Sequence, residues 1–180
     1  MGKVLWHTMM SLDGFIAGPN DEMKWMSGID GGEGRTIGEV LGSTGALLVG
    51  RRTQDVEDRD QPGFYGGAYT GPFFVLRHDP PADPPVVKGV EGECLDVDID
   101  EAVRVAKDAA AGADVVVLGA NIARQCLEAR LLDEIIVHVA PVLVGAGVRL
   151  FERDGSDAVP LRIVSSTQEG ETPVLHYATT

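Results

Sequence analysis

The chain has 180 residues, of which 44% are hydrophobic and 24% charged, a globular balance that fits one domain over residues 1–180. Its 15 lysines and arginines against 28 aspartates and glutamates give a net charge of −13, which disfavours nucleic acid and anionic membrane as partners. Without an apolar run of ~20 residues or a signal-peptide core, we expect a cytoplasmic protein.

The two cysteines, Cys94 and Cys126, form neither a zinc-ligand pattern nor a disulfide framework. Two reduced thiols are favoured, although a single bridge between them stays open. The four histidines are widely scattered along the chain, so we expect no metal site. His7 and His138 lie inside predicted strands, where we expect hydrogen-bonded residues of the sheet.

Apolar runs, caps and turn residues predict an alternation of strands and helices. The predicted strands are residues 3–11, 46–49, 73–76, 115–118, 134–140, 161–167 and 173–179. The predicted helices are residues 33–41, a segment that begins after Asp98 and ends at Gly112, and residues 123–130. The segment after Asp98 matches a capping box, because Glu101 follows three residues later. Glycine- and proline-rich residues predict loops over 27–34 and 78–92.

The order of these elements predicts the fold. Two successive strand–helix–strand units imply parallel strands with helices on both faces of the sheet. The last two strands reverse at Glu169–Gly170 and predict an antiparallel hairpin. We therefore expect a three-layer α/β/α domain with a mixed, mostly parallel sheet.

Small and cationic residues follow three of the predicted strands. Gly119-Ala120-Asn121 joins a strand to a helix, where backbone N–H groups can approach a phosphate and Asn121 can act as N-cap. The run Gly50–Thr53 contains two arginines, and Arg77 follows the next strand. Ligands of open α/β sheets bind beyond the carboxyl ends of the strands, so one crevice is expected to gather these groups around a phosphorylated cofactor. For each motif alone, the alternative is an ordinary βα turn, a solvated helix start or a lone surface arginine, and this alternative is favoured for the Gly119 turn and for Arg77.

Two further segments contain candidate site loops. Residues 9–26 form a turn-rich segment beside the expected crevice and are a candidate lid. Residues 138–151 contain Gly145 and Gly147, which permit a sharp reversal. The sequence has no G-x-S-x-G nucleophile elbow, so a serine hydrolase is not indicated.

Four motifs in this order resemble the RibD C-terminal domain family, which has the dihydrofolate reductase-like fold. They are SLDGFIAG (11–18), LLVGRRT (47–53), VVVLGANIARQCL (115–127) and LLDEIIVHVAPVLVGAGVRLF (131–151). The resemblance implies a mixed sheet of about eight strands, NADPH as cofactor, a homodimer and a link to riboflavin biosynthesis. The deaminase signature of bifunctional family members is absent, so a stand-alone reductase is expected.

Carried over residue by residue, the resemblance implies a cofactor site. Arg51, Arg52 and Thr53 after Gly50 would hold the 2′-phosphate and pyrophosphate, and Leu76 and Arg77 would border the adenine end. The pyrophosphate and nicotinamide would meet Gly119, Ala120, Asn121, Ile122, Ile16 and Ala17. The family usually has Gly-Gly where this chain has Gly119-Ala120.

The resulting hypothesis is an NADPH-dependent reductase that transfers hydride to a C=N or C=O bond of a small pterin-, pyrimidine- or sugar-like substrate. Trp25 is the candidate substrate contact, and Asp30, five residues later, is the candidate proton donor, with Glu33 next. The alternative, which the residues favour, is that Asp30 merely caps the following turn. A folate-specific reductase, and a non-catalytic NADP(H)-binding or regulatory protein with the same fold, are the alternatives.

Overall fold

One large sheet and four α-helices make up most of the computed structural model, which describes residues 2–60, 63–153 and 157–180. The strands of the large sheet are β1 (Val4–Ser11), β3 (Thr44–Gly50), β4 (Phe73–Leu76), β7 (Glu93–Leu95), β8 (Asp114–Leu118), β9 (Glu134–Ala140), β11 (Leu161–Glu169) and β12 (Thr172–Thr179). The helices are α1 (Arg35–Ser43), α2 (Arg51–Arg59), α3 (Ile99–Ala109) and α4 (Ala120–Glu128). Two small ladders pair β2 (Phe15–Ala17) with β10 (Val148–Arg149) and β5 (Val86–Val87) with β6 (Val90–Glu91).

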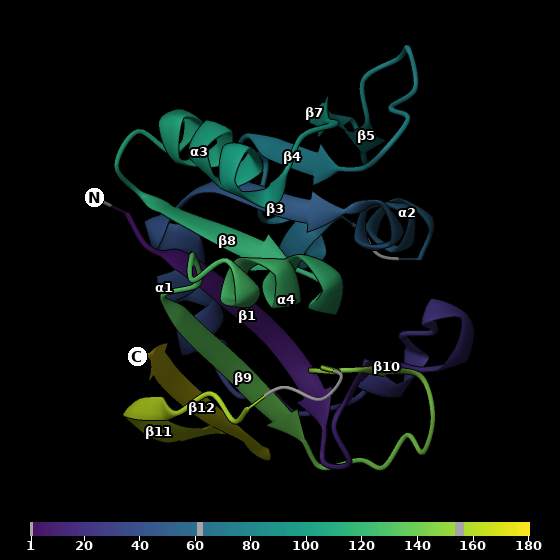
Figure 1. The fold of residues 1–180 in the computed structure, drawn as a ribbon. Helices are drawn as coiled ribbons and strands as arrows, with labels where there is room; N and C mark the ends of the chain where they lie inside the picture. The colour runs from purple at the N-terminus through teal and green to yellow at the C-terminus, as the bar shows by residue number, and fades with distance from the viewer. Residues whose placement is uncertain (1, 61–62, 154–156) are drawn as a thin grey trace.

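The eight strands follow the order β11-β12-β9-β1-β8-β3-β4-β7 (Figure 1). The six strands from β9 to β7 in this order run parallel to one another. β12 pairs antiparallel with β9, and β11 pairs antiparallel with β12. The sheet is therefore mixed and mostly parallel with a C-terminal antiparallel hairpin, as predicted.

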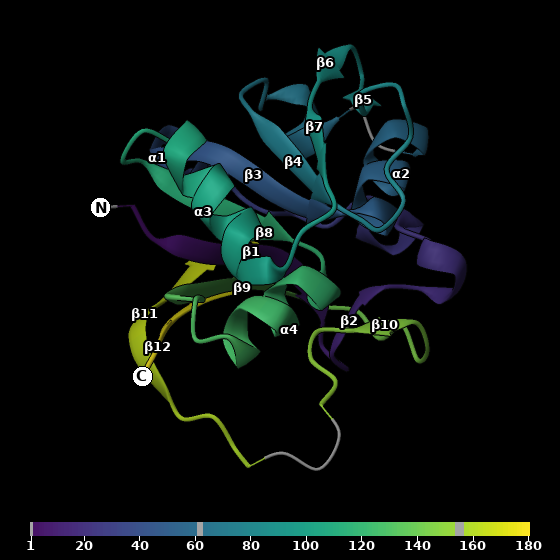
Figure 2. The same ribbon diagram turned by 45° about the horizontal axis from the view of Figure 1, so that its top comes forward.

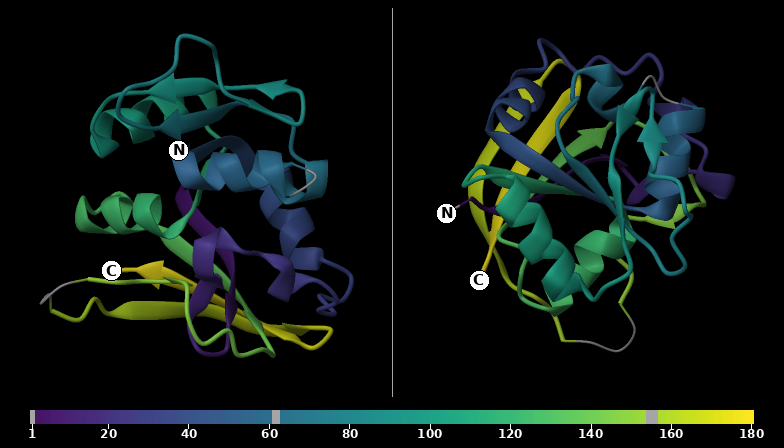
Figure 3. Two further views of the ribbon diagram at one scale, coloured as in Figure 1. Left: turned by 90° about the vertical axis from the view of Figure 1, so that its right-hand side faces the viewer. Right: turned by 90° about the horizontal axis from the view of Figure 1, so that it is seen from above.

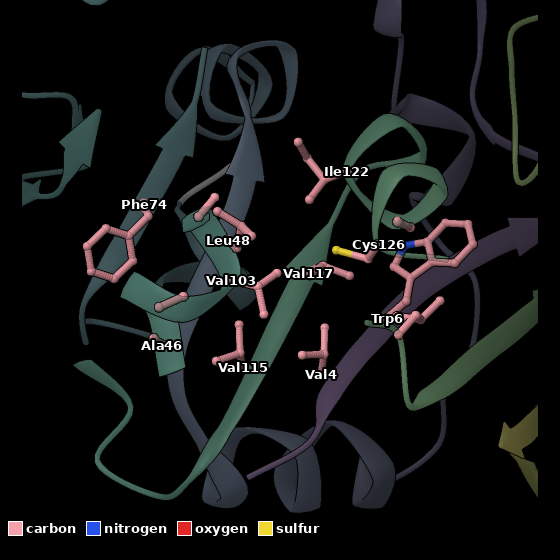
Figure 4. Close-up of a cluster of buried hydrophobic side chains, with 14 of the residues drawn as sticks. Val4, Trp6, Ala46, Leu48, Phe74, Val103, Val115, Val117, Ile122 and Cys126 are labelled. Carbon is pink, nitrogen blue, oxygen red and sulfur yellow. The ribbon is translucent and has the colours of Figure 1, made fainter. Parts of the chain in front are cut away.

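Helices cover both faces of the sheet and make it the middle of three layers. α3 and α4 lie on one face, and α1 and α2 lie on the other (Figure 3). The central strands are buried on both sides, which explains why they are continuous apolar runs such as residues 115–117. Figure 4 shows the core under α3 and α4, where Val103 and Ile122 pack near Val117 of β8.

Local signals account for most of the element boundaries. The Asp98 carboxylate accepts a hydrogen bond from the Glu101 backbone N–H at 2.9 Å and caps α3, as predicted. α4 begins at Ala120, three residues before the predicted start, and its N-cap is Gly119. The prediction of Asn121 as N-cap is wrong, because this residue lies in the first turn and its Oδ1 accepts from Gln125 Nε2 at 2.5 Å.

Six of these elements were not predicted: α2, β7 and the short strands β2, β5, β6 and β10. α2 has Val56 as its only buried residue among those described, so its sequence lacks a helical apolar stripe. β7 joins the edge of the sheet directly after the predicted loop 78–92, which itself contains the β5–β6 hairpin (Figure 2). Cys94 and Cys126 are both free thiols. Within the described residues, no helix is long and apolar enough to cross a membrane.

The Asp13 carboxylate connects two loops at the carboxyl edge of β1 and β9. It accepts hydrogen bonds from the backbone N–H groups of Val144 at 3.0 Å and Gly145 at 2.7 Å, and from Ser11 Oγ at 2.6 Å. These bonds lower the pKa of Asp13 to about 2. The β2–β10 ladder then joins the same two loops. The loop after β1 is therefore held at the edge where the site lies.

Candidate active site

A cavity of about 890 Å³ lies at the carboxyl edge of the parallel strands and extends between α2 and α4. Its volume is near the upper end of the ~300–1,000 Å³ range of ligand sites. All twelve residues predicted for the cofactor line it: Ile16, Ala17, Gly50, Arg51, Arg52, Thr53, Leu76, Arg77, Gly119, Ala120, Asn121 and Ile122. The topology brings them together because β3, β4 and β8 are parallel neighbours and end at the same edge.

Two helix N-termini open into this cavity. α2 begins at Arg51 and α4 at Ala120, and neither N-cap glycine provides a side-chain cap. The N–H groups of each first turn are therefore available to a bound anion. Gly119 has φ 93°, and a Cβ on it would lie 2.5 Å from Thr53 Oγ1. Only glycine allows this close approach of the two helix starts.

The three predicted arginines are not equivalent. Arg52 forms a two-pronged ion pair with Asp21, in which Nε donates to Oδ2 at 3.0 Å. Arg51 has only a loose contact with Asp55 at 3.6 Å. Arg77 has a buried Nε with no hydrogen-bond partner among the described residues. Arg51 and Arg77 thus keep donors for an anion, while Arg52 holds the loop after β1 against α2.

A hydrogen-bonded array of His7, His138 and Tyr65 lines the other end of the cavity. His7 Nε2 lies 2.8 Å from His138 Nε2, and His7 Nδ1 lies 2.9 Å from Tyr65 Oη. Burial and the neighbouring His138 lower the pKa of His7 to about 3, and burial also lowers the pKa of His138. Both rings are therefore neutral near pH 7, and one proton lies between the two Nε2 atoms.

This array has two neutral arrangements. In one, His138 Nε2–H donates to His7, His7 Nδ1–H donates to Tyr65 Oη, and the Tyr65 O–H is free to donate into the cavity. In the other, all donors are reversed and Tyr65 donates to His7. Release of a proton at Tyr65 together with uptake of one at His138 Nδ1 converts the first arrangement into the second. The array can thus supply a proton without forming a buried charge.

Glu57 is a second acidic group that faces the cavity. It lies on α2, one turn after Thr53, and burial raises its pKa to about 7. Among the described residues, no cation forms an ion pair with it. A carboxyl group with this pKa is protonated in part near neutral pH and is therefore a suitable general acid.

The structure places the predicted proton donor and substrate residue outside the cavity. Asp30 Oδ1 accepts from the Gly32 backbone N–H at 2.8 Å, and the Asp30 carbonyl accepts from the Glu171 N–H at 3.1 Å. Asp30 therefore caps a turn next to the C-terminal hairpin, and Glu33 lies in the same region. Trp25, in a 3₁₀ turn (η2, Lys24–Met26), does not line the cavity, whereas its neighbours Met23 and Met26 do. We do not retain these two roles.

Sequence reasoning missed the groups at the proton-donating end. His7 and His138 were expected only as residues of the sheet, and neither Tyr65 nor Glu57 was considered. Glu57 is four residues after Thr53 and on the same face of α2, but this helix was not predicted and so gave no signal. For the histidines, the pairing of β1 with β9 places Met9 opposite His138, and a sequence does not show this register.

The strand order and the antiparallel C-terminal pair define a dihydrofolate reductase-like α/β domain. The chain belongs to the RibD C-terminal domain family, whose model matches residues 71–175. It is 24% identical over 176 residues to the "Uncharacterized protein YwjB" of Bacillus subtilis (strain 168), covering 97% of both chains.

Solved structures share the fold over the full chain. A Shewanella sp. PV-4 protein named for riboflavin biosynthesis is 20% identical, with a TM-score of 0.79 and 99% coverage of both chains. A diaminohydroxyphosphoribosylaminopyrimidine deaminase/5-amino-6-(5-phosphoribosylamino)uracil reductase from Thermotoga maritima is 15% identical, with a TM-score of 0.73. That match covers 99% of this chain and 57% of the Thermotoga chain. The protein is therefore related to RibD-like reductases.

Proposed function

We propose that this protein is an NADPH-dependent reductase of a small C=N or C=O compound. The observation that carries the proposal is that one cavity joins an anion-binding end to a proton-donating end. The anion-binding end consists of Arg51, Arg77 and the starts of α2 and α4, and the proton-donating end consists of the His7–His138–Tyr65 array and Glu57. The presence of reductases among the structural neighbours supports this proposal.

The residues at the anion-binding end fit a phosphorylated cofactor. The unpartnered Nε of Arg77 and the uncapped first turns of α2 and α4 provide donors that a phosphate group satisfies. In our proposal Arg51 and Arg77 bind the 2′-phosphate, the helix starts bind the pyrophosphate, and Ile16 and Ala17 pack near the nicotinamide. The positive charge of these arginines also counters locally the repulsion that the net charge of −13 exerts on the cofactor.

When bound, NADPH supplies a hydride to the carbon of the double bond and becomes NADP⁺, so the nitrogen or oxygen of that bond must receive one proton. Tyr65 donates this proton from its free O–H and is reprotonated by His7 Nδ1–H. His7 then receives the Nε2 proton of His138, which takes one from water at Nδ1. Glu57 is the alternative donor, since its pKa of about 7 keeps a large fraction protonated.

Cofactor binding is tested by titrating the purified protein with NADPH and following its fluorescence. We expect Arg77→Gln to weaken NADPH binding about tenfold, because one charge-assisted phosphate contact is lost. Arg104→Gln is the matched control, since Arg104 is on α3 with Glu101 and Asp108 as its partners. Equal affinity of native and Arg77→Gln protein would contradict the assigned site. Binding without turnover of any acceptor would favour the non-catalytic alternative.

The proton donor is tested by comparing pH profiles of NADPH oxidation. If Tyr65 is the donor, Tyr65→Phe should lower kcat ~100-fold or more and leave NADPH affinity unchanged. If Glu57 is the donor, Glu57→Gln should have that effect and abolish the limb of the profile near pH 7. If both variants retain the native rate, the proton comes from another group and this assignment is wrong.

We also propose that the protein is a homodimer whose interface contains β11. Eight of the nine residues of this edge strand are exposed, among them Leu161, Ile163 and Val164. A strand with exposed apolar side chains and an unpaired edge favours association with a second copy. Light scattering should give twice the chain mass for the native protein and the monomer mass for Ile163→Lys, with Ser165→Lys as the control on the same strand.

A further inference from the structure

The end of the cavity next to the proton-donating groups is largely apolar and has no unpaired cation among the residues that the structure describes. We call it the substrate end and define it by the following lining residues: Met9, Met23, Met26, Ile37, Tyr65 and His7. In the described part of the chain, no lysine lines the cavity. Arg52, the arginine that contacts the loop carrying Met23 and Met26, is ion-paired with Asp21, and the other lining arginines lie at the start of α2, after β4 or on α4. By its composition the substrate end is suited to an apolar body with one polar group.

The charges around the substrate end are neutral or negative. His7 and His138 are uncharged, because burial lowers the pKa of each ring. Glu57 faces the same space and is ionised in part near pH 7. The adjacent Asp21 is already paired with Arg52. A phosphate monoester bound here would be desolvated, would have no unpaired cation as its partner and would lie near the Glu57 carboxyl group, and each of these effects opposes its binding.

The arginines with free donors follow strands other than β1 and β9, which carry the histidines of the substrate end. β4, which precedes Arg77, lies three strands from β1 in the sheet, or about 14 Å at the usual spacing between strands. In the proposed function, Arg51 and Arg77 are already engaged by the cofactor. The side chain that enters the substrate end from α1 is Ile37, which is uncharged.

We infer that the compound reduced in this cavity is an uncharged, phosphate-free ring with a C=N or C=O group. Its flat face would lie against Met23 and Met26, whose thioethers adapt to aromatic and conjugated rings. Its heteroatom would accept from Tyr65. The inference rests on the proposed function. It separates this chain from the Thermotoga relative, whose name specifies a substrate with a phosphoribosyl group.

Paired acceptors test the inference with the 180-residue protein saturated with NADPH. One pair is 5-amino-6-(5-phosphoribosylamino)uracil and the same compound after phosphatase treatment, and 7,8-dihydropterin is the third, uncharged acceptor. We expect at least one uncharged acceptor to be reduced, and the dephosphorylated compound to have a kcat/KM at least tenfold above that of its phosphate ester. Preference for the phosphate ester overturns the inference. So does failure of all uncharged acceptors to be reduced or to bind, by calorimetry on the NADP⁺-loaded protein.

A charge insertion tests the stated cause. Ile37→Lys places one cation at the rim of the substrate end and should raise kcat/KM for the phosphate ester about tenfold relative to Ile37→Gln. Ile37 is 37% exposed, so both variants are expected to fold. If the two variants have the same kcat/KM for the phosphate ester, the lack of a cation is not what excludes phosphate, and the inference fails. Absence of NADPH binding in the native protein instead refutes the proposed function, and the inference falls with it.

Discussion

Replacing His7 with glutamine should remove much of the acid sensitivity of folding. His7 is buried in hydrogen bonds to His138 and Tyr65, and its pKa falls from 6.5 to about 3 on folding. Between these two values the unfolded chain binds a proton that the folded protein excludes. Stability is therefore fully present above pH 6.5 and is lost as the pH falls. Glutamine is uncharged at every pH and can keep one hydrogen bond to each partner.

The magnitude follows from the two pKa values. Between pH 8 and pH 5 the protonation of His7 in the unfolded chain costs about 2 kcal/mol, at 1.36 kcal/mol per unit. For a chain of this size, ~2 kcal/mol corresponds to a Tm decrease of about 4–8 °C. His7→Gln should be less stable than the native protein at pH 8, but should lose about 2 kcal/mol less between pH 8 and pH 5.

Urea unfolding followed by circular dichroism at several pH values between 8 and 5 measures this difference. His78→Gln is the matched control, because the His78 side chain is 95% exposed and should leave the pH dependence unchanged. A His7→Gln protein with the native pH dependence would refute the reasoning. It would mean that His7 is protonated as easily in the folded protein as in the unfolded chain.

Three further predictions concern the site and its support. Arg51→Ala should weaken NADPH about tenfold and leave NADH nearly unchanged in fluorescence titrations, because only NADPH carries the 2′-phosphate, and equal losses would contradict this role. Asp13→Asn should lower the Tm at pH 7 by weakening the bonds to residues 144–145, and the difference should disappear as the pH falls towards 2, through the lowered pKa of Asp13. Asp30→Asn should retain native turnover and pH profile, because its carboxylate lies outside the cavity, and a ~100-fold loss would restore it as proton donor.

Local sequence signals were sufficient for most of the fold. The runs at 73–76 and 134–140 have the strand bounds observed for β4 and β9, because fully buried parallel strands are continuous apolar segments. The Asp98 cap located α3 in the same way. α2 was not predicted because its sequence lacks an apolar stripe. β7 was not predicted because its three residues are too few to show an alternating pattern.

The anion-binding end was also predictable from the sequence. Arg51, Arg77 and Gly119 each follow a strand, and parallel neighbours must place such residues at a common edge. No knowledge of side-chain packing was needed for this step. The sequence does not show which of these arginines are available to an anion. In the structure Arg52 is ion-paired with Asp21, whereas Arg51 and Arg77 keep free donors.

The sequence by itself determined the layered fold and the edge that holds the phosphate-binding residues, since both depend on local patterns and strand direction. Only the tertiary structure decided which groups can supply a proton. His7 and His138 are 131 residues apart and meet through the register of β1 with β9. Glu57 is an ordinary surface residue by sequence until burial under the surrounding elements raises its pKa. Register and burial are properties of the assembled fold, and for this reason the proton-donating end emerged from the structure alone.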